Sequence, residues 1–148
     1  MAEREELRKR LMLQKTKNLI SVIEGIKVLE YEEQTLFDEE YLRRINYLGQ
    51  DKIPDSKISD RSNDAEVTVW INKFIDLRKD QLWYIWLNGY LVKIQILDTE
   101  KAITGLWNNI DPDCKGFVLI DEDKKMMYEF GNDSRNEENY LFDKYPLV

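Results

Sequence analysis

The spacing of apolar residues divides the chain into a helical first half and a strand-rich second half. Between residues 3 and 30, apolar side chains recur three or four positions apart, which predicts one long helix on this pattern. They include Leu7, Leu11, Leu19, Val22, Ile23, Ile26 and Leu29. A second helix is predicted over 38–48, because Asp38 can cap its first turn and Gly49 suits its end.

The middle of the chain contains one polar stretch and one ambiguous one. Residues 50–64 combine Pro54 with many polar turn formers, which predicts a loop. Residues 66–77 fit a helix through Val67, Trp70, Ile71 and Phe74. A strand is the alternative, because Val67, Val69 and Ile71 also alternate with other residues as in a strand. We favour the helix, since the periodic stretch exceeds the usual length of a strand.

The second half carries the strongest hairpin signal. Two aromatic and β-branched runs flank Asn88-Gly89, a pair that supplies the positive φ of a type I′ turn. A short helix capped by Asp98 or Thr99 should follow, then a second hairpin made by 117–120 and 126–130, and a final strand or anchored tail over 140–148. The chain is therefore predicted to be a single α+β domain over residues 1–148. Its N-terminal helices should pack on one face of a C-terminal antiparallel sheet built from hairpins.

Composition narrows the chemistry available to the chain. It has no histidine and a single cysteine, Cys114, which excludes His-based catalytic sets, His or multi-Cys zinc sites and an internal disulfide. The net charge is -7 over 148 residues, yet residues 1–20 hold six Lys or Arg against three Glu. An overall acidic chain has no global basic footprint for nucleic acid. The charged N-terminus, the single cysteine and the absence of a long apolar run predict a cytoplasmic protein that does not enter a membrane.

Residues 111–122 resemble a calcium loop at several positions. Asp111, Asp113, Gly116 and Glu122 occupy relative positions 1, 3, 6 and 12 of an EF-hand loop. Lys115 stands where an oxygen ligand is expected, and a strand-like run follows Gly116 in place of a helix. A turn that leads into the second hairpin is therefore the favoured interpretation, and no metal or other cofactor is predicted.

The same stretch resembles the metal site of the restriction-endonuclease-like enzymes. That resemblance assigns a divalent ion to Asp113 and Glu122, with Lys124 assisting the attacking water. The context disagrees, because Glu122 and Lys124 fall in a predicted turn where they should point to solvent. A divalent-metal-dependent, nuclease-like enzyme is kept as the alternative function.

Small size, acidity and the missing cofactor motifs favour a binding protein over an enzyme. We expect an inhibitor such as an immunity protein or antitoxin, which would neutralise a basic toxin enzyme, for example a nuclease, by electrostatic occlusion. The expected contacts are acids of the second hairpin and the loop after it: Asp121, Glu122, Asp123, Asp133, Glu137 and Glu138. A structural or scaffold subunit that pairs through its N-terminal helix is a further alternative.

Overall fold

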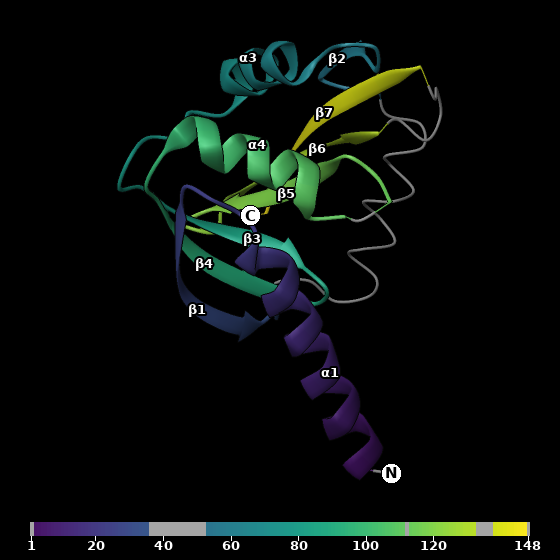
Figure 1. Cartoon of the computed structure of the whole chain (residues 1–148), viewed down its shortest axis with the longest axis vertical. Helices are drawn as coiled ribbons and strands as arrows, with labels where there is room; N and C mark the ends of the chain where they lie inside the picture. Colours follow the sequence, from purple (N-terminus) through teal and green to yellow (C-terminus); the bar gives the residue numbers. More distant parts are fainter. Residues whose placement is uncertain (1, 36–52, 112, 133–137, 148) are drawn as a thin grey trace.

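The described residues form one seven-stranded antiparallel sheet that carries helices on one face (Figure 1). The computed structural model describes residues 2–35, 53–111, 113–132 and 138–147. The helices are α1 (Ala2–Ser21), α3 (Asp64–Phe74) and α4 (Thr99–Asn109). The strands are β1 (Ile26–Glu33), β2 (Ser56–Ser59), β3 (Leu82–Leu87), β4 (Tyr90–Ile96), β5 (Gly116–Asp121), β6 (Met126–Asn132) and β7 (Asn139–Pro146).

The strand order confirms the predicted α+β class and its hairpins. It runs β1-β4-β3-β5-β6-β7-β2, so consecutive hairpins occupy the centre. The two edge strands, β1 and β2, come from the first half of the chain. Asn88 and Gly89 have φ values of 53° and 82°, as the type I′ turn between β3 and β4 requires.

The main core lies between the sheet and its helices. Ile85, Val92 and Ile94 point from the central hairpin toward Ile71 of α3 and Leu106 of α4, and all five are 0% exposed. The preference for a helix within residues 66–77 is confirmed by α3. Its first turn is fixed by a capping box, in which Asn63 and Glu66 each accept a hydrogen bond from the other's backbone N–H.

A second apolar cluster lies on the opposite face of the sheet. It contains Tyr84, Leu91, Ile120, Met127 and Tyr145, none more than 9% exposed. Alternate residues of the β3–β4 hairpin are therefore buried on both faces. This agrees with the nearly continuous apolar sequence of the hairpin.

The single helix predicted over residues 3–30 is wrong in its second part. α1 ends at Ser21, and the chain turns at Gly25, where φ is 82° and the carbonyl accepts hydrogen bonds from the N–H groups of Leu97 and Asp98. From Ile26 the chain is β1, which pairs with β4. Because Ile26 fits the helical spacing with Leu29 and also alternates with Val28 as in a strand, the periodicity alone could not separate the two structures.

The predicted loop over residues 50–64 is wrong where β2 forms. Ser56–Ser59 pairs with β7 at the edge of the sheet, and the Ser56 hydroxyl accepts a hydrogen bond of 3.0 Å from the indole N–H of Trp70. A strand of four residues carries too short an alternation to be recognised among polar neighbours. The helix predicted over 38–48 lies outside the described residues.

Candidate protein-binding surface on the helical face

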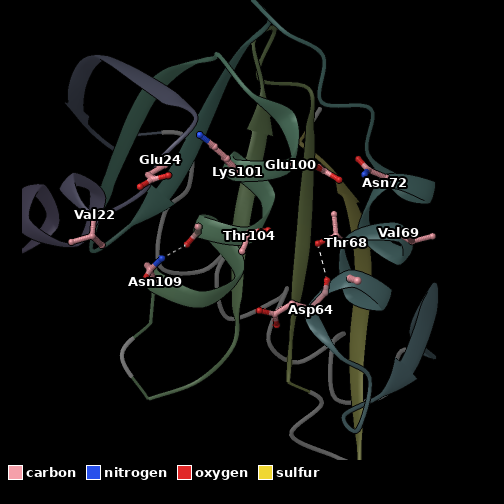
Figure 2. Close-up of a pocket in the computed structure, with 12 residues that line it drawn as sticks. Val22, Glu24, Asp64, Thr68, Val69, Asn72, Glu100, Lys101, Thr104 and Asn109 are labelled. Carbon is pink, nitrogen blue, oxygen red and sulfur yellow. Dashed lines mark hydrogen bonds between the residues drawn. The ribbon is translucent and has the colours of Figure 1, made fainter.

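A groove of about 610 Å³ runs between α3 and α4 on the outer side of the helical layer (Figure 2). Side chains reach it from both helices and from the segment that follows α1. The lining is polar around a floor of small residues: Val22, Glu24, Asp64, Ala65, Thr68, Val69, Asn72, Glu100, Lys101, Thr104, Gly105 and Asn109. Because the side chains between the two helices are small, the groove has room for a segment of another molecule.

Two glycines bring the end of α1 close to α4. A Cβ on Gly105 would lie 2.8 Å from Cγ2 of Ile23, and a Cβ on Gly25 would lie 2.6 Å from the carbonyl oxygen of Asp98. Both distances are too short for a real contact, so only glycine permits this approach. The approach places Val22 and Glu24 at the border of the groove.

The groove is predominantly acidic. Glu24, Asp64 and Glu100 contribute three carboxylates against the single ammonium of Lys101. All four side chains are exposed, so they can meet a charged partner without the desolvation penalty of a buried site. An acidic groove of this kind suits a basic segment of another molecule.

A second groove, of about 510 Å³, continues from the first along α1. It shares Val22 and Asn109 with the first groove and extends past Asn18 to Leu11. Leu11 is 63% exposed, and Val22 is 60% exposed, as is Val69 in the first groove. Exposed apolar side chains that line adjoining grooves are typical of an interaction surface.

The acids predicted to contact a partner do not form one patch. Asp121, Glu122 and Asp123 lie where β5 turns into β6, whereas Glu138 precedes β7 at the other end of the sheet. Asp133 and Glu137 lie outside the described residues. The Asp121 carboxylate accepts hydrogen bonds from the backbone of Lys125 and Met126 at 2.8 and 3.2 Å, so it closes the turn. Glu122 and Asp123 are exposed.

Glu138 lies close to the segment that precedes α3. Its carbonyl accepts a hydrogen bond from the Asp60 N–H at 3.0 Å. Burial, and then the negative charges of Asp60 and Asp64, raise the pKa of Tyr140. Asp64, which lines the groove, is therefore near Tyr140 of β7, the strand that Glu138 precedes.

The structure does not assemble the nuclease-like set. Asp113 precedes β5 and Glu122 follows it, so roughly 20 Å of strand separates them, at about 3.3 Å for each of its residues. One ion could not contact both carboxylates. In the described part of the chain, no group of three or more acidic or Cys side chains is placed to hold a metal ion.

Lys124 does not point to solvent, contrary to the sequence-based expectation. It adopts φ of 57° and folds back over the sheet, where its Nζ lies 2.8 Å from Oε1 of Glu32 and 4.8 Å from the centre of the Tyr84 ring. The hydrogen bond to Glu32 raises the pKa of Lys124. This lysine therefore joins the β5–β6 turn to β1.

The predicted opening of the second hairpin at Gly116 is confirmed. The Asp113 N–H donates a hydrogen bond of 2.9 Å to the Asp111 carboxylate. Gly116 then begins β5 with φ of 132°. A strand therefore stands where an EF-hand would continue as a helix.

The acids of the groove were not singled out in the sequence. Asp64 and Glu100 occupy the first turns of α3 and α4, where acidic residues are common because they oppose the helix dipole. Only the packing of α3 against α4 shows that they share a groove with Glu24. Comparison of the chain with known protein families, characterised proteins and solved structures finds no match. No helix in the described residues is long and apolar enough to cross a membrane.

Proposed function

We propose that this protein is a cytoplasmic inhibitor that binds a basic protein partner, in the manner of an immunity protein or antitoxin. The observation that carries the proposal is the α3–α4 groove, with its three exposed carboxylates and its apolar border. A toxin enzyme that acts on nucleic acid presents a basic cleft, and such a cleft complements this surface.

The charge of the whole chain supports the same role. A net charge of -7 accelerates encounter with a basic partner and makes the association rate sensitive to salt. The exposed acids Glu122 and Asp123, although they lie at the β5–β6 turn, contribute to this long-range attraction. Close contact is assigned to the groove, because it combines charge with apolar side chains.

The experiment compares two acidic surfaces on one scaffold. A tagged chain is used to isolate a stoichiometric partner from its native cells, and the purified partner is then titrated with two variants. Glu24→Gln/Asp64→Asn/Glu100→Gln removes the charges of the groove, and Glu122→Gln/Asp123→Asn is the matched control at the turn. All substituted positions are exposed, so both variants should fold.

We expect the groove variant to weaken affinity by at least about tenfold and to relieve inhibition of the partner's activity. The turn variant should lower mainly the association rate at low salt. If the turn variant abolishes binding and the groove variant does not, the acidic turn is the contact surface. A partner that is acidic, or that binds both variants as it binds the unaltered chain, would contradict the proposal.

A further inference from the structure

We infer that the α3–α4 groove binds an extended polypeptide segment that carries two basic side chains four positions apart. The inference rests on the proposed function and deepens it, because such a segment is the part of a basic partner that enters the groove. Three features of the groove carry it: the places of its carboxylates, the polar side chains between them, and its length.

The two helices present the same kinds of side chain in opposite directions. Each contributes an acid from its first turn, a threonine one turn later and an asparagine near its end: Asp64, Thr68 and Asn72 from α3, and Glu100, Thr104 and Asn109 from α4. The helices are antiparallel, since the side-chain amide of Asn108 donates a hydrogen bond of 3.4 Å to the Asp64 carboxylate. Figure 2 shows Asp64 toward one end of the groove, and Glu100 and Asn72 toward the other. The groove therefore has a carboxylate at each end.

Asp64 and Glu100 dominate the charge of the groove. Gly25, which directly follows Glu24, packs against α4, because a Cβ added to this glycine would lie 2.9 Å from the Cβ of Lys101. Glu24 and Lys101 are therefore neighbours on one side of the groove, and their opposite charges offset each other. The Glu100 carboxylate makes no hydrogen bond or ion pair with any described residue. Two separate carboxylates are thus available to two basic side chains.

The side chains between the two acids favour an extended segment over a helical one. An extended backbone has N–H and C=O groups that need hydrogen-bond partners, and the hydroxyls of Thr68 and Thr104 can supply them. A helix forms those bonds internally and binds a groove through apolar contacts. Such contacts are few here, because only Val22, Ala65 and Val69 among the described lining residues have apolar side chains.

The length of the groove sets the spacing of the basic side chains. Along α3, Asp64 and Asn72 are eight residues apart, about 12 Å at a rise of about 1.5 Å for each residue. Since Glu100 lies at the Asn72 end, a similar distance separates the two carboxylates. An extended chain covers about 13 Å in four residues, and side chains four positions apart point to the same side of it. Side chains three positions apart point to opposite sides, so only one of them can reach an acid.

Two labelled peptides of identical composition test this spacing on the full chain. Gly-Lys-Ser-Ala-Ser-Lys-Gly has its lysines four positions apart, and Gly-Lys-Ser-Ala-Lys-Ser-Gly has them three apart. Fluorescence anisotropy at low salt should show that the first peptide binds about fivefold more tightly, which is the upper value of one exposed ion pair. Equal affinities, or no binding of either peptide, would overturn the inference.

Single substitutions at the two ends of the groove test which acids are read. With Asp64→Asn or Glu100→Gln, one carboxylate is left, so the two peptides should bind with nearly equal affinity. Glu122→Gln/Asp123→Asn is the control at the β5–β6 turn and should keep the fivefold preference. All four positions are exposed, so the variants should fold. A preference that survives both groove substitutions would show that the peptides bind elsewhere.

The inference and the proposed function can fail separately. If the triple groove variant relieves inhibition of the isolated partner but the unaltered chain does not distinguish the peptides, the inference fails and the proposed function stands. If the chain selects the first peptide, yet the partner binds the triple groove variant as tightly as it binds the unaltered chain, the proposed function fails. The preference of the groove for paired basic side chains then stands.

Discussion

The two halves of α1 share one helical backbone but have opposite relations to the rest of the protein. In the second half, Thr16 is 0% and Ile20 is 2% exposed, and both face the sheet. In the first half, Leu7 and Leu11 face solvent. Apolar side chains of α1 are therefore part of the core in one half of the helix and exposed to solvent in the other.

The difference arises from what lies beneath each half. The β3–β4 turn holds α1 through two hydrogen bonds: Asn88 donates its side-chain amide to the Thr16 hydroxyl at 3.2 Å, and the Tyr90 hydroxyl donates to the Lys9 carbonyl at 3.3 Å. No described element underlies the turns before Lys9. The fold thus explains why α1 begins to be buried near residue 13, but it does not account for the leucines before that point.

The largest contrast should appear when one apolar side chain is shortened in each half. Ile20→Ala leaves a cavity in the core and should lower the free energy of unfolding by about 3 kcal/mol. Leu11→Ala should change it by less than about 0.5 kcal/mol, since the side chain is exposed. Urea unfolding measures both. Equal losses would mean that the first half of α1 is part of the core.

The junction that fixes the second half of α1 should be nearly as sensitive. Gly25→Ala places a Cβ against the backbone of Asp98 and Ala102, at 2.6 and 2.8 Å, and should destabilise the protein by about 2–3 kcal/mol. Gly89→Ala is the control, because Gly89 has the same φ of 82° but no atom within 4 Å of the added Cβ. Gly89→Ala should lower the free energy of unfolding only by the cost of the left-handed conformation, about 1 kcal/mol. Thermal unfolding separates the two, and equal shifts would exclude a steric role for Gly25.

A smaller effect is expected at the hydrogen bond beneath α1. Thr16→Val keeps the shape of the side chain but removes the oxygen that accepts a hydrogen bond from the Asn88 amide. The change should lower the free energy of unfolding by about 1 kcal/mol. Thr68→Val on α3 is the matched control. The Thr16 hydroxyl donates to the Met12 carbonyl and the Thr68 hydroxyl to the Asp64 carbonyl, each four residues earlier, but the Thr68 hydroxyl accepts no described hydrogen bond. In the same urea titration, Thr68→Val should leave the free energy of unfolding almost unchanged. A larger loss at Thr68 would show that the hydroxyl–carbonyl bond within the helix, and not Asn88, is what matters.

The smallest effect is expected at the ion pair between α1 and β1. Lys9 and Glu33 are 3.5 Å apart, with side chains 63% and 60% exposed. Glu33→Gln should therefore change the free energy of unfolding by less than about 1 kcal/mol, and by less still at high salt. Urea titrations at two salt concentrations measure it. A large, salt-independent loss would show that the contact is not a surface ion pair.

The sequence was sufficient where chemistry is local. Asn88-Gly89 dictates its own turn, and Asp98 caps α4 by accepting a hydrogen bond from the Lys101 N–H at 3.1 Å, so the hairpin and α4 were predicted correctly. The α+β class followed from these elements. The sequence failed where two periodicities coincide, as they do at Ile26, and where a strand is short, as β2 is.

The candidate site was less accessible to sequence reasoning. Its acids are separated by about 75 positions along the chain, from Glu24 to Glu100, and each has an ordinary helical or turn role on its own. Asp121, Glu122 and Asp123 are consecutive in the sequence, yet the β5–β6 turn and Glu138 lie at opposite ends of β6. Charge density along a chain does not reveal charge density on a surface.

The position of β2 has a consequence for the order of folding. This strand of four residues pairs only with β7, whose partner positions lie about 80 residues further along the chain, at Asn139–Phe142. Closing so long a loop costs entropy that four residues repay poorly, whereas β5, β6 and β7 pair with near neighbours. β2 should therefore join the sheet last and open first. In a native-state hydrogen-exchange experiment, its amides would lose protection before those of the central hairpins.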